Sequence, residues 1–82
     1  MNTFEEVWKQ HLENVMKYID DNNKRPSSTD KNTIIKKLGN WIGTQQKRYK
    51  IKIRIMNNEE IYNKWTDFIN SIKYKHYFIS NK

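Results

Sequence analysis

The side chains of this sequence that are best placed to do chemistry are basic and amide groups on the stretch from Ile34 to Lys50. If this stretch is an α-helix, one straight row of its surface is formed by Lys36, Asn40, Gly43 and Lys47. Lysine ammonium groups bind the phosphates of a polyanion, and an amide beside them can hydrogen-bond a phosphate or the edge of a base. A glycine in this row would let a phosphate reach the helix backbone, although tolerance of a weakened helix explains the glycine equally well.

The positive charge of the chain is concentrated around this row. The net charge is +7, yet the residues from Lys31 to Asn58 contain eight Lys or Arg and no Asp or Glu. The remaining residues contain eight basic and nine acidic side chains, which is a net charge of −1. A merely soluble basic protein would scatter its charge, whereas this basic segment, Lys31 to Asn58, indicates a surface for a polyanion.

We predict that the contact surface joins the basic face of this helix to the connector that follows it. Lys37 and Arg48 flank the row, and the connector adds basic side chains at alternate positions. The predicted contact residues are Lys36, Lys37, Asn40, Gly43, Lys47, Arg48, Lys50, Lys52 and Arg54.

Residue patterns that support catalysis or metal binding are missing from the sequence. There are two His and no Cys, and no HExxH, CxxC or GxxxxGK[ST] spacing occurs. The acidic pairs Glu5–Glu6 and Glu59–Glu60 fall in predicted first helical turns, where the helix dipole accounts for them. His11 is interpreted as a surface or half-buried side chain and not as a ligand. We therefore predict no enzymatic activity, no metal and no cofactor.

Three stretches with apolar residues at helical spacing must position the contact surface. The first is predicted over about 4–21, where Thr3 and Glu6 form a capping box. Its apolar side is formed by Phe4, Trp8, Leu12, Val15, Met16 and Ile19. This helix is rich in Asp and Glu, which repel phosphates, so we assign it to core and support.

The second helix, which carries the row, is predicted over about 32–50, after a polar loop that contains Pro26. Its apolar side is formed by Ile34, Leu38, Trp41, Ile42, Gln45 and Tyr49. Gly39 lies at the edge of this stripe, where a missing side chain would let another helix or its tryptophan come close. Gln45 is a core-facing amide, so we expect it to hydrogen-bond a loop backbone. In the preceding loop, Lys24 and Arg25 are interpreted as solvated charges.

The third helix is predicted over about 58–73, with a capping box of Asn57 and Glu60 and an apolar contact of Met56 with Ile61 before it. The alternating connector from Lys50 to Met56 has no second strand to pair with, so we interpret it as a fraying helix end and an extended link. Some of its isoleucines should turn inward. The aromatic tail, 74–78, should fold back onto the helices. The predicted fold is all-α, a compact three-helix bundle that forms one domain over 1–82.

Several of these features together resemble the helicase-associated domain family. The shared features are Trp8 with Leu12 and Tyr18, Arg25-Pro26, Leu38-Gly39-x-Trp41-Ile42, Gln45-Gln46-Lys47, Tyr49, and Trp65-x-x-Phe68. The resemblance covers nearly the whole chain, and its Asn, Ile and Lys bias is similar to the giant-virus versions. The family consists of three-helix modules, often repeated behind the motor of bacterial and large-DNA-virus helicases. This chain departs from it in holding one copy and no motor.

The resemblance implies nucleic-acid binding, and we expect duplex DNA before RNA, with phosphate contacts and weak sequence specificity. It also implies a helicase or another viral protein as partner, and a place in the nucleus, a viral factory or the virion. We expect neither secretion nor a membrane span, because the start is acidic and no apolar run approaches about 20 residues. The alternative is a protein–protein or self-assembly module, an adaptor or genome-coating protein, that uses the basic face on an acidic partner.

Overall fold

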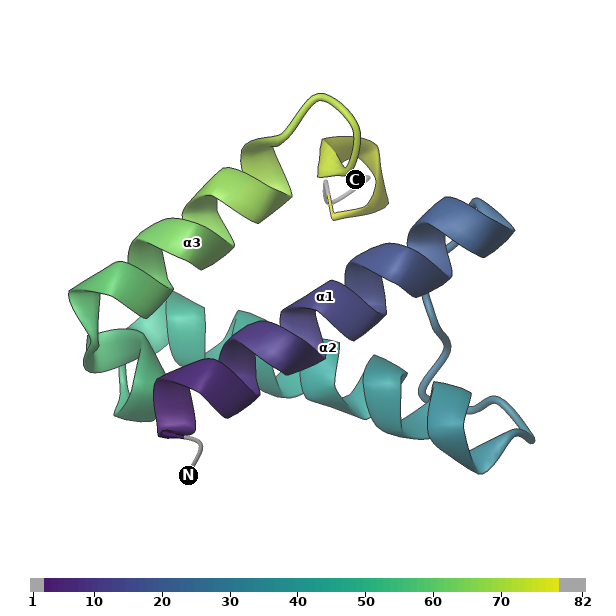
Figure 1. Cartoon of the computed structure of the whole chain (residues 1–82), viewed down its shortest axis with the longest axis horizontal. Coiled ribbons are helices and arrows are strands. Elements are labelled where there is room, and N and C mark those ends of the chain that lie inside the picture. Colours follow the sequence, from purple (N-terminus) through teal and green to yellow (C-terminus); the bar gives the residue numbers. More distant parts are fainter. Residues whose placement is uncertain (1–2, 79–82) are drawn as a thin grey trace. The chain divides into compact units, whose positions relative to one another are not determined.

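The computed structural model describes residues 3–78 of the chain, and every regular element in that range is helical (Figure 1). The elements are α1 (Phe4–Asn22), α2 (Thr33–Ile51), the short 3₁₀ helix η1 (Arg54–Asn57), α3 (Glu59–Asn70) and the 3₁₀ helix η2 (Lys75–Tyr77). No residue from 3 to 78 lies in a strand. The predicted all-α fold with three α-helices is therefore confirmed.

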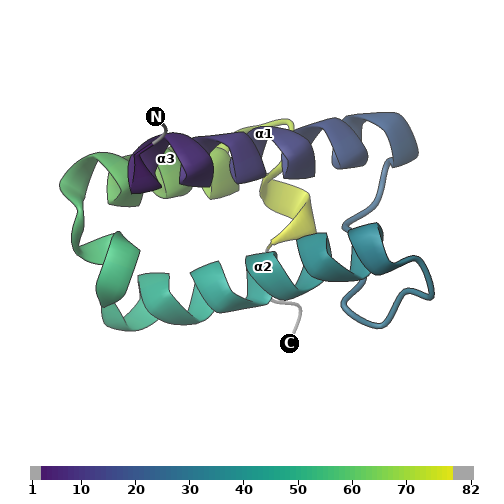
Figure 2. The same ribbon diagram turned by 60° about the horizontal axis from the view of Figure 1, so that its bottom comes forward.

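The chain divides into two compact units, the first ending at Thr44 and the second beginning at Gln45. The division falls within α2, so this helix contributes its first part to one unit and its last part to the other. In the first unit, α1 and the start of α2 run in opposite directions on either side of the 23–32 loop (Figure 2). In the second unit, the chain reverses through η1, and α3 follows.

Helix α1 begins at the capping box that the sequence predicts. The Thr3 hydroxyl accepts from the Glu6 amide at 3.1 Å, and the Glu6 carboxylate accepts from the Thr3 amide at 3.0 Å. The helix ends at Asn23, whose φ of 55° is left-handed, and asparagine tolerates that conformation better than most residues. Both ends of α1 therefore carry residues that suit the backbone there.

Aromatic and aliphatic packing holds the first unit together. The Trp8 and Trp41 ring centroids are 5.5 Å apart. His11, an exposed residue of α1, also stacks on the Trp41 ring. The buried side chains of α1 are Trp8, Leu12, Val15 and Ile19. Two predicted stripe residues stay outside, since Phe4 is 86 % and Ile34 is 71 % exposed. Both residues lie in the first turns of their helices, where the apolar stripe extends beyond the part of the helix that is packed against other residues.

The start of α2 is fixed by a side-chain cap and by a tight approach of the preceding loop. The Asn32 side-chain oxygen accepts from the Ile34 and Ile35 amides at 2.9 and 3.3 Å. A Cβ on Gly39 would lie 2.5 Å from the Ser27 carbonyl carbon and 2.8 Å from the Ser28 Cα. Gly39 thus admits a loop backbone, where the sequence led us to expect a helix or a tryptophan.

The second unit has an aromatic core to which α3 and the tail both contribute. The Phe68 ring lies 5.3 Å from Trp65, and 5.0 Å from both Tyr74 and Phe78, between centroids. The tail folds back, as predicted, and Tyr74 is buried. Helix α3 ends at Asn70, short of the predicted end near 73, and Ile72 is 88 % exposed.

The segment that enters α3 differs from the prediction in two respects. The N-cap is Asn58, whose side chain accepts from the Ile61 amide at 3.1 Å, so the predicted Asn57–Glu60 capping box is wrong by one residue. The link after α2, predicted to be extended, is mostly a 3₁₀ turn, because η1 follows Ile53 directly. That turn leaves Ile51 and Ile53 exposed, and only Met56 is buried.

In the part of the chain that the structure describes, no helix has the length and apolarity needed to cross a membrane.

Candidate nucleic-acid interface

The first unit presents four of the predicted contact residues on α2. Lys36, Lys37, Asn40 and Gly43 are all exposed. A Cβ built on Gly43 would meet nothing within 4 Å, so its backbone is open to an incoming group. Within residues 3–78 neither lysine is paired with a carboxylate, and the backbone amide of Lys36 donates to the Asn32 carbonyl. These groups are available to bind an anion.

The second unit presents the other five, beginning with the last turns of α2. Lys47 and Lys50 are exposed, while Arg48 is half-buried. The C-terminal end of a helix carries a partial negative charge, so basic residues in this turn also stabilise α2 itself. Part of the basic character of this end is therefore explained by the helix alone.

The two basic residues beyond α2 adopt an uncommon backbone conformation. Lys52 has φ 54° and Arg54 has φ 56°, both in the left-handed region that side chains usually avoid. The Ile53 amide donates to the Arg48 carbonyl at 3.1 Å, which closes α2 with a Schellman motif that places Lys52 at the position glycine usually occupies. Strained non-glycine positions concentrate at functional sites. Strain and charge thus coincide at Lys52 and Arg54.

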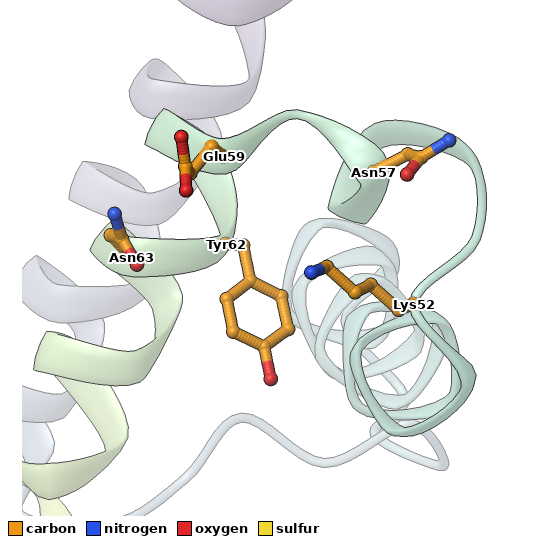
Figure 3. Close-up of a pocket in the computed structure, with 5 residues that line it drawn as sticks. All are labelled: Lys52, Asn57, Glu59, Tyr62 and Asn63. Carbon is orange, nitrogen blue, oxygen red and sulfur yellow. The ribbon is translucent and has the colours of Figure 1, made fainter.

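The side chain of Lys52 also forms one wall of a pocket in the second unit. Its Nζ lies 5.0 Å from the centroid of the Tyr62 ring, and Figure 3 shows the lysine reaching toward that ring. The pocket has a volume of about 370 Å³ and is lined by Lys52, Asn57, Glu59, Tyr62 and Asn63. It lies in the size range of ligand sites. Sequence reasoning missed it, because η1 and the first turns of α3 meet Lys52 only after the chain has reversed.

Tyr62 is held in place by its own neighbours. Its ring stacks on Tyr49, with centroids 4.6 Å apart and planes 24° from parallel. A hydrogen bond with the Tyr49 side chain raises the pKa of the Tyr62 phenol. The Tyr49 hydroxyl and the Thr66 hydroxyl are 2.8 Å apart, which ties the end of α2 to α3 within this unit. The ring therefore has a defined orientation toward the pocket.

Three other side chains that the sequence singled out, Arg25, His11 and Gln45, do not belong to the predicted contact surface. Arg25, interpreted from the sequence as a solvated charge, is instead half-buried in the 23–32 loop, and burial lowers the pKa of its guanidinium. His11 is exposed and stacked on Trp41, as expected for a surface side chain. Gln45 is 3 % exposed, which agrees with its assignment to the core-facing side of α2.

Comparison of this chain with known proteins does not assign it to a family. No protein-family model, no curated protein and no solved structure matches this chain significantly. Among residues 3–78, no three His, Cys, Asp or Glu side chains come together in a group that could hold a metal ion. The roles of the interface residues are therefore argued from this chain alone and not from a relative.

Proposed function

We propose that this chain is a non-catalytic nucleic-acid-binding module that contacts the phosphates of duplex DNA through α2 and the segment from Lys50 to Met56. The observation that carries the proposal is the exposure of the basic segment. Seven of its eight Lys and Arg side chains are exposed, Arg48 is half-buried, and the segment holds no carboxylate to neutralise them. Exposed cations bind phosphates by releasing the counterions around DNA.

The conformational costs of this region support the same proposal. Gly43 weakens α2 at an open surface position, and Lys52 and Arg54 occupy left-handed backbone where glycine would be less strained. All three residues are exposed, and of these only Lys52 has a described contact, with the face of the Tyr62 ring. The resemblance to the helicase-associated domain points in the same direction and remains a prediction, as do a helicase or other viral partner and an intracellular place of action.

Phosphate contacts give this proposal a quantitative test. If about five basic residues meet phosphates, the logarithm of affinity should fall against the logarithm of salt concentration with a slope of about −4 to −5 on duplex DNA. A titration series at increasing salt on duplex DNA, single-stranded DNA and RNA measures this slope and the preferred nucleic acid.

The salt series also distinguishes the rival function. An adaptor or genome-coating protein held to a protein partner would show weak DNA binding with a flat salt response. That result would remove the electrostatic proposal and favour a protein–protein interface. A steep slope on duplex DNA with weaker binding to RNA is the result that we expect.

A further inference from the structure

The pocket beside Lys52 differs in chemistry from the rest of the basic segment. Its lining combines one cation with a carboxylate, two amides and an aromatic ring, namely Lys52, Glu59, Asn57, Asn63 and Tyr62. A site for phosphate would not place a carboxylate in its wall, because like charges repel. The occupant that suits this lining is planar, uncharged and polar at its edge.

We propose, resting on the nucleic-acid binding proposed above, that this pocket holds one unpaired base of the bound DNA, with Tyr62 as the surface on which the base stacks. Aromatic side chains bind unpaired bases in this way whatever the base, since every base has a π-face. The pocket is large enough, at about 370 Å³, and its ring is already oriented by Tyr49.

The polar lining matches the edge of a base. The Glu59 carboxylate accepts hydrogen bonds, and the Asn57 and Asn63 amides both donate and accept. Figure 3 shows Glu59 and Asn63 on α3 on one side of Tyr62, and Asn57 on the other side, with its amide turned away from the ring. In the described chain no hydrogen bond or ion pair engages these three side chains. They remain available for the amino and carbonyl groups of a base.

Lys52 links this pocket to the phosphate surface. Its ammonium lies over the Tyr62 ring, a cation–π contact that a flexible, exposed side chain can leave. When a base stacks on the ring, the lysine is released beside that nucleotide and can pair with its phosphate. The left-handed φ of 54° at Lys52 directs the chain into η1 at this point, which keeps the lysine next to the pocket.

The proposal is tested by comparing a blunt duplex with the same duplex carrying a short single-stranded overhang. The wild-type chain should bind the overhang duplex roughly tenfold more tightly, the effect expected of one stacked base. A 2-aminopurine placed in the overhang should lose fluorescence on binding, because stacking quenches it. Asn63→Phe fills the pocket and should abolish both effects, with blunt-duplex affinity unchanged. Asn14→Phe, at an exposed asparagine of α1, is the matched control and should change neither.

A second pair of variants separates stacking from folding. Tyr62→Phe keeps the ring and should keep the overhang preference, whereas Tyr62→Leu should lose it while the blunt duplex still binds. Equal wild-type affinity for the two duplexes would overturn the base pocket and leave the phosphate surface standing. Binding to neither duplex would overturn the proposed function, and the base pocket with it. An overhang preference that survives Asn63→Phe and Tyr62→Leu would also overturn the pocket.

Discussion

Helices α1 and α2 have the same length, 19 residues each, but they differ in charge and in how well each residue suits its position. The first turn of α1 carries Glu5 and Glu6, the helix has a complete capping box, and it ends on an asparagine in left-handed backbone. The last turn of α2 is basic, the helix contains both glycines of the chain, and it ends on a left-handed lysine. Most of these features of α1 favour folding, although Asp20 and Asp21 in its last turn oppose the helix dipole. Several features of α2 oppose folding.

This difference indicates which helix is shaped by something other than stability. Of the α2 features, only Gly39 is explained by packing, because the Ser27–Ser28 backbone lies against it. Gly43 has no such explanation in the described chain, and Lys52 is accounted for by the Schellman motif that ends α2 and by its contact with the Tyr62 ring. Both residues are exposed next to basic side chains. The comparison therefore assigns α1 to support and assigns α2 with its connector to binding.

The largest effect is expected in the supporting helix. Trp8→Ala removes a ring that is 5 % exposed and lies 5.5 Å from Trp41. We expect a loss of about 3–5 kcal/mol, a large share of the stability of so small a chain. Urea unfolding followed by circular dichroism measures it. A Trp8→Ala protein that unfolds at the wild-type urea concentration would contradict the assignment of α1 to the core.

The two glycines of α2 should respond to alanine with opposite signs. Gly39→Ala forces a Cβ against the Ser27–Ser28 backbone and should destabilise the fold by about 1–3 kcal/mol. Gly43→Ala adds a methyl group in open space and should stabilise α2 by about 0.5–1 kcal/mol.

Thermal melting of both variants measures this difference, and a shift of the same sign in both would contradict the packing described for α2. The DNA affinity of Gly43→Ala then decides between the two explanations of this glycine. Weaker binding at higher stability supports close approach of a phosphate to the backbone. Unchanged binding supports a tolerated helix weakening.

The two left-handed helix ends provide the next comparison. Lys52→Gly relieves backbone strain and should stabilise the fold by about 1 kcal/mol, while Asn23→Gly should change it by only a few tenths, since asparagine already tolerates this region. Lys52→Gly should also weaken duplex binding and reduce the salt slope by about 1, because one phosphate contact is lost. A stabilised Lys52→Gly protein that binds as the wild type does would show that this lysine has no role in binding.

The sequence alone was sufficient for the fold class and for most helix positions, because local signals set them. The Thr3–Glu6 capping box and the spacing of Trp8, Leu12 and Val15 can be read directly, and the structure has both. The ends of the apolar stripes could not be read, since periodicity shows that Phe4 and Ile34 share a face but not how far the facing surface extends. The predicted cap at Asn57 failed because two adjacent asparagines offer the same side chain.

The sequence predicted which basic side chains of the candidate site are exposed, but it did not predict the backbone conformation or the pocket of that site. The exposure of Lys36 and Lys47 follows from helical spacing opposite the apolar stripe. The left-handed backbone at Lys52 could not be predicted from the sequence, because this conformation is normally predicted from a glycine or an asparagine. The pocket around Tyr62 depends on how η1 turns the chain, and an alternating pattern of Lys and Ile suggests a strand there instead.

The smallest effect on stability is expected from the variant with the largest effect on binding. Lys36→Glu with Lys47→Glu reverses one exposed charge in each unit without touching the apolar side of α2. We expect each substitution to change stability by no more than about 0.5 kcal/mol. The matched control is Lys17→Glu with Lys64→Glu, which changes the net charge equally at exposed positions of α1 and α3. It removes the exposed Lys17–Asp21 ion pair and places a negative charge one turn from Glu13 and Asp21, and each of these changes costs about 0.5 kcal/mol or less.

Titration of a blunt DNA duplex with these two double variants and the wild type, at one salt concentration, tests the central claim most directly. If α2 and its connector form the contact surface, Lys36→Glu with Lys47→Glu lowers affinity far more than Lys17→Glu with Lys64→Glu, while both proteins stay fully folded at the temperature of the titration. Equal losses in the two double variants would show that net charge alone drives binding, and the assignment of α2 to binding would be wrong.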